Sequence, residues 1–365
     1  MIGLAIGWRL AEAGCEVDIF ERDEAGRGAS WAAAGMLAAG VECEPGEIDL
    51  LALNRRSQEL WPHFAAELER ASGQSVGLRQ EGTLVVALTR DDAAQLRFAH
   101  DFQRKQGIET EFLSGAAARQ LEPHLHPNLV AALFSSADHQ VDNRLLVRAL
   151  IAAFRHAGGR LHEHAPVAAI DRVGGRAAGV CVGDARHEAD IVVLAAGAWS
   201  GQVAGLPRAI PVRPVKGQML ALGMDKAAPL LRHVVWAPKA YLVPRHDGRL
   251  VVGATTEERG FDARLTAGGI LALLEGAWRV VPGIEELPID EMWVGFRPGS
   301  RDDAPMLGPG GTDGLVLATG HHRNGILLTP VTSEAMARYI LTGALDPVVR
   351  PFALDRFAAP ATEEA

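Results

Sequence analysis

The chain has 365 residues, 48% of them apolar and 22% charged, which is enough to bury a large core and form two domains. A formal net charge of -9 and a pI near 5.8 exclude a basic surface for nucleic acid or anionic membranes. Aromatic residues make up 5%, too few for a platform that stacks single-stranded bases. No stretch approaches the roughly 18 uninterrupted apolar residues of a membrane-spanning helix.

The three cysteines, Cys15, Cys43 and Cys181, lie far apart in the sequence and form no CxxC pair. This spacing excludes a recognisable zinc or redox motif and is typical of a reducing compartment. We therefore expect a cytoplasmic protein without a bound metal.

The first 21 residues follow the order helix, strand, acid. Residues 4–13 are mainly Ala, Leu and Ile and end at Gly14, which predicts a helix. Residues 16–20 alternate apolar and polar side chains as a strand does, and Glu21 follows directly. In a dinucleotide-binding βαβ unit, Gly3 would be the last glycine of the GxGxxG fingerprint and Glu21 would bind the ribose. An ordinary amphipathic helix followed by a strand gives the same pattern.

The segment GRGASWAAAGMLA, residues 26–38, is rich in small side chains. Small residues let a backbone approach a ligand closely, and Ser30 could donate a hydrogen bond to a phosphate. A buried helix of small residues packed against its neighbours would look the same.

Clear periodic patterns predict the elements of the first half. We expect a strand in the stretch 81–88, and helices over residues 50–72, 90–107 and 145–157.

Short strands are expected around 165–170 and 178–182, and a buried strand over 190–194. The stretch 210–260 is rich in β-branched residues and predicts an antiparallel sheet. A strand over 315–320, a turn, and a helix over 326–341 with Pro330 in its first turn and Gly343 at its end complete the chain. The two ends of the chain therefore predict one nucleotide-binding α/β layer, with the β-rich centre inserted as a second domain.

Two arginines occupy positions that suit anion binding. Arg297 follows an apolar strand and precedes Pro-Gly, although a lone arginine is usually a surface residue. Arg323 lies in a glycine-bounded turn before a helix, where the backbone N–H groups of Asn324, Gly325 and Ile326 are expected to point at an anion. His321 and His322 have no acid at metal-ligand spacing, so we expect them to be turn residues.

Six segments together resemble the D-amino-acid oxidase superfamily of FAD-dependent enzymes and, within it, the glycine oxidases associated with thiamine biosynthesis. They are SWAAAGML, the ECE at 42–44, LPRAIPVRPVKGQ, YLVPR with GRLVVGAT, GFRPGSRDDAPMLG and ATGHHRNGILLTP.

The resemblance implies an α/β fold in which an antiparallel β-sheet substrate domain is inserted into a Rossmann-like FAD-binding domain. The FAD-binding domain would comprise residues 1–50, 140–208 and 300–357. The substrate-binding domain would comprise 51–139 and 209–299, with a tail over 358–365.

The resemblance also implies which residues contact FAD. Glu21 would bind the ribose, Arg22 would lie beside the adenosine, and Val167 would contact the adenine end through its backbone. Ala29 and Ser30 would meet the pyrophosphate, Ala34, Gly35 and Met36 would line the flavin, and residues 321–327 would wrap its pyrimidine ring. The implied cofactor-binding residues are Met1, Ile2, Gly3, Glu21, Arg22, Ala29, Ser30, Ala34, Gly35, Met36, Val167, His321, His322, Arg323, Asn324, Gly325, Ile326 and Leu327.

The implied catalytic and substrate-binding residues are Arg297, Tyr241 and Arg323, with Arg297 gripping the substrate carboxylate bidentately. The implied reaction is oxidative deamination of glycine, sarcosine or D-alanine to the 2-oxo acid, ammonia and hydrogen peroxide, for thiamine thiazole synthesis. A sarcosine oxidase, a D-amino-acid dehydrogenase and a non-catalytic flavoprotein are the alternatives. The resemblance leaves a homo-oligomer such as a tetramer open.

Members of this family begin with a strand and the whole glycine fingerprint, whereas this sequence begins inside the fingerprint. We therefore expect an N-terminally truncated form that lacks a central strand and two glycines, and that folds poorly or binds FAD weakly.

Overall fold

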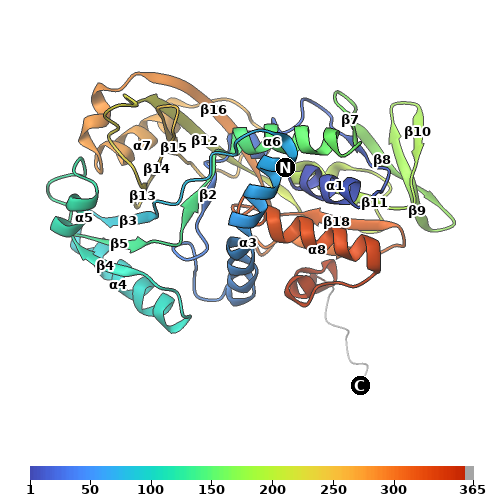
Figure 1. The fold of residues 1–365 in the computed structure, drawn as a ribbon, viewed down its shortest axis with the longest axis horizontal. Helices are drawn as coiled ribbons and strands as arrows, with labels where there is room; N and C mark the ends of the chain where they lie inside the picture. Colours follow the sequence, from blue (N-terminus) through green and yellow to red (C-terminus); the bar gives the residue numbers. More distant parts are fainter. Residues whose placement is uncertain (358–365) are drawn as a thin grey trace. The chain divides into compact units, whose positions relative to one another are not determined.

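The computed structural model describes residues 1–357, so the tail predicted at 358–365 lies outside the described residues. The chain divides into two compact units, which Figure 1 traces in sequence colours. Unit 1 consists of Met1–Arg27, Leu150–Pro214 and the chain from Arg297 onward, and unit 2 consists of Gly28–Ala149 and Val215–Phe296.

These bounds differ from the expected domains at the small-residue segment. The sequence predicts residues 28–50 and 140–149 in the nucleotide-binding layer, but they belong to unit 2. One reason is that β2 (Met36–Leu37) pairs antiparallel with β6 (His139–Gln140), a strand of the same unit. Which unit binds FAD and which binds substrate stays a prediction.

Unit 1 is the Rossmann-like α/β part. Its parallel pairs are β1 with β7 and β11 with β18, while β17 pairs antiparallel with the other edge of β18. Strands β8, β9 and β10 form a separate antiparallel meander. The elements are α1 (Ile2–Glu12), β1 (Asp18–Phe20), β7 (Arg160–His162), β8 (Val167–Val173), β9 (Arg176–Val182), β10 (Ala185–Glu188), β11 (Val192–Leu194), η1 (Gly197–Gln202), β17 (Met306–Pro309), β18 (Leu315–Thr319), α8 (Thr329–Thr342), η3 (Pro347–Phe352) and η4 (Leu354–Phe357).

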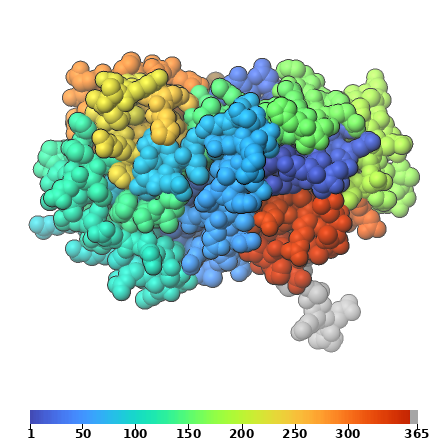
Figure 2. Space-filling model, viewed as in Figure 1, coloured from blue at the N-terminus to red at the C-terminus, as the bar shows by residue number. Residues whose placement is uncertain are grey.

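Helix α1 is buried along most of its length, with Leu4, Ile6 and Trp8 at most 4% exposed. It contacts α8 and β18, and Figures 1 and 2 show its dark blue surface against the red of α8. Each such side chain contributes about 1.5–3 kcal/mol by leaving water. A Cβ at Gly7 would come within 2.8 Å of the end of the Ile19 side chain, so the helix packs closely on the strand there.

Unit 2 contains most of the β-structure. Its elements are α2 (Ala29–Ala32), β2, α3 (Ile48–Ser72), β3 (Thr83–Ala87), α4 (Arg90–Lys105), β4 (Glu111–Ser114), α5 (Gly115–Leu121), β5 (Ala131–Ser135), β6, β13 (Val234–Trp236), β14 (Tyr241–Pro244), β15 (Arg249–Gly253), α7 (Ala267–Trp278) and η2 (Pro282–Glu286). A unit boundary falls inside α6 (Asn143–His156), β12 (Arg213–Gly223) and β16 (Ile289–Gly299).

One eight-stranded sheet organises unit 2, in the order β16-β12-β15-β14-β13-β3-β5-β4. Strand β13 pairs in parallel with β3, whereas β12–β15, β14–β15, β3–β5 and β4–β5 are antiparallel. Leu84, Val235 and Leu242 are fully buried in its core. The antiparallel sheet predicted for residues 210–260 is therefore present, and strands β3, β4 and β5 extend it.

The predicted α/β fold class, with an antiparallel sheet inserted into a Rossmann-like layer, is confirmed, and the long helices match their predicted ranges closely. The last helix is an exception, because α8 begins at Thr329 and not at Ile326. Residues 325–328 form a turn in which the Thr329 N–H donates to the Ile326 carbonyl, and Pro330 does lie in the first turn of the helix. Within residues 1–357, no helix is long and apolar enough to cross a membrane.

Candidate active site

The start of α1 and the acid after β1 lie close together in unit 1. A Cβ at Gly3 would sit 3.2 Å from that of Ala195, just after β11, so the helix start approaches a strand end tightly. Burial lowers the pKa of the Met1 amino group to about 6, while the Glu21 carboxylate acts in the opposite direction. The structure thus brings together Met1, Gly3 and Glu21, three predicted cofactor positions.

Arg22 and Val167 lie near the same strand. The Arg22 guanidinium stacks 3.8 Å from the Trp199 ring, which holds it against the protein surface. Val167 is the first residue of β8, and two residues earlier the Ala165 N–H donates to the Glu21 carbonyl at 2.8 Å. The roles of Arg22 and Val167 beside the adenosine stay predictions.

The turn before α8 contains two histidines, both neutral at physiological pH. His321 is buried, its Nε2 lies 3.2 Å from the Thr332 hydroxyl, and burial lowers its pKa to about 3. His322 adopts a φ of 44°, and its N–H donates to the Pro298 carbonyl at 3.0 Å. A non-glycine residue in this left-handed region stores strain, which is typical of functional sites.

Three guanidinium groups act on the His322 imidazole. Burial is the largest cause that lowers its pKa, to about 4, and Arg323, Arg297 and Arg213 lower it further. The bond from the His322 N–H to the Pro298 carbonyl places the two predicted substrate-binding arginines of unit 1 on adjoining segments, because Arg297 precedes Pro298 and Arg323 follows His322. Arg297 is half-buried at the end of β16, and Arg323 is exposed.

Asp303 supplies the countercharge of this arginine group. Its Oδ1 lies 3.5 Å from His322 Nδ1 and 3.7 Å from a guanidinium nitrogen of Arg213, which also donates to the Ser300 carbonyl. The sequence analysis missed Arg213 and Asp303. Asp303 could have been noticed, because it belongs to the same RPGSRDD motif as Arg297.

The backbone N–H groups of the turn differ in what they bind. The Asn324 N–H donates to the His321 carbonyl at 2.9 Å, so the expectation that it points at an anion is wrong. The N–H groups of Gly325 and Ile326 have no partner within residues 1–357, and Ile326 is buried. Buried backbone donors are nearly always paired, so the Ile326 N–H in particular fits an electron-rich ligand group.

In unit 2, side chains distant in sequence bind the carbonyls of the small-residue segment. Asn143 Nδ2 donates to the carbonyls of Ser30 at 2.7 Å and Trp31 at 3.0 Å. The Trp293 indole N–H donates to the Ala32 carbonyl at 3.1 Å, and Arg245 Nη2 to the Ala34 carbonyl at 2.6 Å.

A further bond of the same kind involves Gly35. We call the hydrogen bonds of Asn143, Trp293, Arg245 and Val141 to the carbonyls of residues 30–35 the carbonyl clamp. The Val141 N–H donates to the Gly35 carbonyl at 2.8 Å. Gly35 has a φ of 68°, and a Cβ there would overlap the Val141 carbonyl oxygen. Only glycine therefore fits at this predicted flavin contact. The sequence analysis missed all four clamp residues.

The Arg144 guanidinium stacks on two tryptophans next to the carbonyl clamp. Arg144 is 9% exposed, and its guanidinium lies 4.2 Å from the Trp31 ring and 4.9 Å from the Trp293 ring. It also binds both carboxylate oxygens of Glu291, at 2.7 and 3.1 Å. This arrangement fixes both tryptophans beside the segment.

Tyr241 lies at the start of β14, half-buried in a cluster that includes Ala34, Met36 and Trp293. Gly253 faces it across the sheet, and a Cβ there would lie 2.6 Å from the phenol ring. The Trp236 ring packs edge-on at 6.0 Å. The structure thus groups Tyr241 with two predicted flavin contacts of unit 2.

Comparison with known proteins identifies the family. The model of the DAO family, described as FAD-dependent oxidoreductase, matches residues 1–339. The chain belongs to the FAD-dependent oxidoreductases. Glycine oxidase from Geobacillus kaustophilus is 36% identical, covering 98% of this chain and 94% of that protein. A crystal structure of glycine oxidase from the same organism has a TM-score of 0.91 at 35% identity, covering 98% and 96% of the two chains.

Two further relatives extend the comparison. The bifunctional protein ThiO/ThiG of Trichormus variabilis is 35% identical over 99% of this chain, which spans only 54% of that longer protein. Iminodiacetate oxidase from Chelativorans is 27% identical with a TM-score of 0.87, covering 96% of both chains. These matches confirm the predicted family resemblance and the FAD cofactor, and they show that the chain is an FAD-dependent oxidoreductase.

The residues present fit FAD. Gly35 provides backbone that no other residue could, Gly3 lets the start of α1 approach Ala195 closely, and the buried N–H of Ile326 has no acceptor within residues 1–357. The assignment of each residue to a part of the cofactor stays a prediction. Within residues 1–357, no three His, Cys, Asp or Glu side chains are grouped as a metal site requires.

Proposed function

We propose that this oxidoreductase deaminates glycine and small amines such as sarcosine and D-alanine. The products are the 2-oxo acid, ammonia and hydrogen peroxide, and the imine or glyoxylate serves thiamine thiazole synthesis. The family is one of FAD-dependent oxidoreductases, and the similarity to glycine oxidases and to the ThiO/ThiG proteins supports oxidation of an amine and the finer assignment. The observation that carries the proposal is the hydrogen bond from the His322 N–H to the Pro298 carbonyl at 3.0 Å, because it places the turn that contains Arg323 beside the strand end that contains Arg297.

An amino-acid substrate brings a carboxylate, and the arginine group offers positive charge for it. Because His322 is neutral, the guanidinium groups supply that charge, and Asp303 balances only part of it. Arg297 is best placed to bind both carboxylate oxygens, since it is half-buried on a strand end and not on a flexible loop. Such a fork would fix the direction of the substrate's α-carbon.

Bound FAD would supply the redox chemistry, namely removal of a hydride from the substrate's α-carbon and transfer of the two electrons to oxygen. The chain itself provides positioning and electrostatics. The free N–H groups of Gly325 and Ile326 would stabilise negative charge that develops near them. The carbonyl clamp would hold residues 30–35 rigid, and Tyr241 would wall the substrate cavity.

Replacing Arg297 with methionine tests the proposal. Without the guanidinium, the bound substrate carboxylate loses its charged partner, which costs about 2–5 kcal/mol of binding free energy. We therefore expect kcat/KM for glycine to fall by roughly 30- to 5,000-fold. Oxidation of methylamine, which lacks a carboxylate, should change little. Arg301→Met is the matched control, because Arg301 is exposed and four residues away in the same unit. Normal glycine turnover by an FAD-loaded Arg297→Met variant would refute the assignment.

One series of assays determines both the preferred substrate and the electron acceptor. Glycine, sarcosine and D-alanine are compared for peroxide release and for reduction of an artificial dye. A sarcosine oxidase would prefer the secondary amine, and a dehydrogenase would reduce the dye without releasing peroxide. A cytoplasmic location and a homo-oligomeric state stay predictions.

A further inference from the structure

Strand β16 lies against the small-residue segment along one of its two faces, which we call the inner face. Side chains alternate between the two faces of a strand, so every second residue of β16 belongs to the inner face. By this alternation the residues of the inner face include Glu291, Trp293, Gly295 and Arg297. The contacts of the first three therefore indicate what surrounds Arg297.

Glu291 and Trp293 both act on the small-residue segment. The Trp293 indole N–H donates to the Ala32 carbonyl at 3.1 Å. Glu291 binds Arg144 at 2.7 Å, and that guanidinium lies 4.2 Å from the Trp31 ring. The inner face is thus fixed to residues 31 and 32 from one end of β16.

The closest contact of the inner face is at Gly295. A Cβ added there would lie 2.3 Å from the Cβ of Ala32, a residue only 6% exposed. Nonbonded carbon atoms prefer separations of about 3.5–4.0 Å, and the Ala32 Cβ cannot rotate away because it is fixed to the backbone. Any side chain at residue 295 would therefore push β16 and the small-residue segment apart by about 1 Å.

The small-residue segment and α7 cover opposite faces of the eight-stranded sheet. Leu273 of α7 packs in one cluster with Val252, whereas Ala34 packs in another with Val251. Since Val251 and Val252 are neighbours in β15, their side chains point to opposite faces.

Phe296 belongs to the face of β16 opposite the small-residue segment. Its ring packs at 5.3 Å against Phe261, which lies in the connection between β15 and α7. The alternation therefore continues through residue 296. Arg297, the next residue of β16, returns to the inner face and follows directly on the contact between Gly295 and Ala32.

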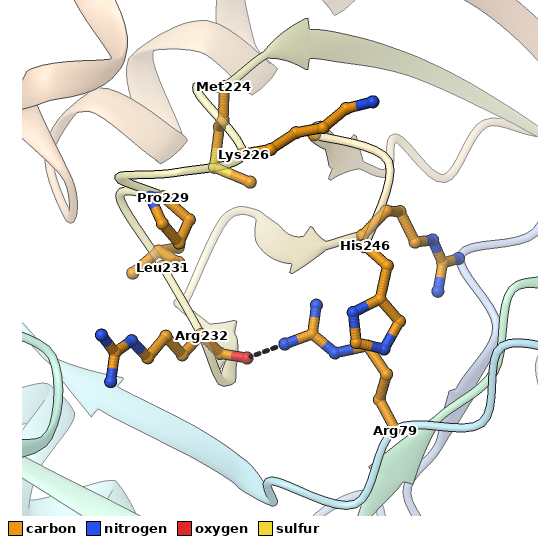
Figure 3. A pocket seen from close by; sticks show the side chains of 9 residues that line it. Arg79, Met224, Lys226, Pro229, Leu231, Arg232 and His246 are labelled. Carbon is orange, nitrogen blue, oxygen red and sulfur yellow. Dashed lines mark hydrogen bonds between the residues drawn. The ribbon is translucent and has the colours of Figure 1, made fainter.

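The pocket in Figure 3 lies elsewhere in unit 2. It has a volume of about 110 Å³ and is lined by Arg245 and His246, which follow β14, and by Arg79, whose guanidinium donates to the Arg232 carbonyl. None of its lining residues belongs to β16 or to the small-residue segment, so it offers no room to a side chain at residue 295.

We propose that Gly295 is a positioning residue, which sets how far Arg297 lies from the predicted flavin contacts at residues 34–36. This inference rests on the proposed function, in which Arg297 holds the substrate carboxylate beside bound FAD. A misplacement of about 1 Å can slow a reaction by about 100-fold. The missing side chain at residue 295 therefore serves the reaction as well as the packing.

Exchanging the two side chains tests the proposal. Gly295→Ala adds the clashing Cβ, and anaerobic flavin reduction by glycine should become about tenfold or more slower per bound FAD. Gly295→Ala/Ala32→Gly also removes the Cβ that is met, so the rate should return to within about threefold of the wild type. Gly223→Ala is the control in a neighbouring strand, because its Cβ would meet the movable end of Asp290 at 3.0 Å, and it should behave as the wild type.

Acetate separates positioning from loss of binding, because it has a carboxylate but no amine. Arg297 is retained in Gly295→Ala, so the acetate concentration that gives half of the rise in melting temperature should stay within about threefold. The change in flavin absorbance on acetate binding should shrink in Gly295→Ala and return in the exchange variant. A lower melting temperature with an unchanged reduction rate per bound FAD indicates a structural role alone and would overturn the proposal.

The exchange variant decides the question even where Gly295→Ala does not fold. An exchange variant that is insoluble, or that holds FAD but reduces it about tenfold more slowly than the wild type, overturns the positioning role. The proposed function fails separately, if none of glycine, sarcosine and D-alanine reduces the flavin of the wild type. The acetate absorbance change then still tests the spacing.

Discussion

Gly35→Ala should damage the protein far more than its backbone angle alone explains. Any alanine at a φ near 68° costs about 1–2 kcal/mol, because its Cβ crowds the following carbonyl. At residue 35 the Cβ would also overlap the Val141 carbonyl, so the segment must move away. That movement breaks the hydrogen bond between the Val141 N–H and the Gly35 carbonyl, worth about 0.5–1.5 kcal/mol. It also strains the charged hydrogen bond from Arg245 to the Ala34 carbonyl, worth about 1.5–3 kcal/mol.

Gly73→Ala is the matched control for this substitution. Gly73 lies in the same unit and has a φ of 69°, and a Cβ added there would have no atom within 4 Å. We expect Gly35→Ala to lower the free energy of unfolding by about 2–4 kcal/mol more than Gly73→Ala. It should also lose FAD on gel filtration. Urea denaturation and flavin absorbance measure both effects, and equal losses in the two variants would refute the steric argument.

Two further predictions concern the same segments. Asn143→Ala removes the donor to the Ser30 and Trp31 carbonyls, so the free energy of unfolding should fall by about 1–3 kcal/mol and FAD should bind more weakly. Urea denaturation and FAD titration measure the two effects. Asn128→Ala, at an exposed position, is the control and should change neither. The pKa values of His321 and His322 are near 6.5 in the unfolded chain but about 3 and 4 in the folded protein. The unfolded chain therefore binds more protons below pH 6.5, and the free energy of unfolding decreases as the pH falls through this range. At pH 5 each histidine should lower the free energy of unfolding by about 2 kcal/mol, and His322→Gln should remove about half of the combined loss; an unchanged pH slope in that variant would contradict the assigned protonation.

The sequence predicted those features whose signal is local. Helix α1, the long helix α3 and the strand at 315–319 follow from periodicity and flanking glycines, and Arg297 and Arg323 stand in motifs that can be read along the chain. Helix α8 begins later than predicted because the Thr329 N–H bonds the Ile326 carbonyl three residues back, while the Gly325 carbonyl accepts from the Thr329 hydroxyl.

The carbonyl clamp could not be predicted, because its bonds join residues more than 100 positions apart. Asn143 binds Ser30 across 113 residues, and Trp293 binds Ala32 across 261. Nothing in the neighbourhood of Asn143 or Trp293 distinguishes it from an ordinary polar or core position. The small-residue segment indicated a close approach but not the side chains that make it.

The strand order of unit 2 has a consequence for how the protein is made. The central pairing joins β3 to β13, so a strand at residues 83–87 stays without that neighbour until residue 236 has left the ribosome. During that interval the apolar edge of a half-built sheet is exposed to other chains. Expression yield should therefore respond to translation speed and chaperone supply more strongly than the stability of the finished enzyme would suggest.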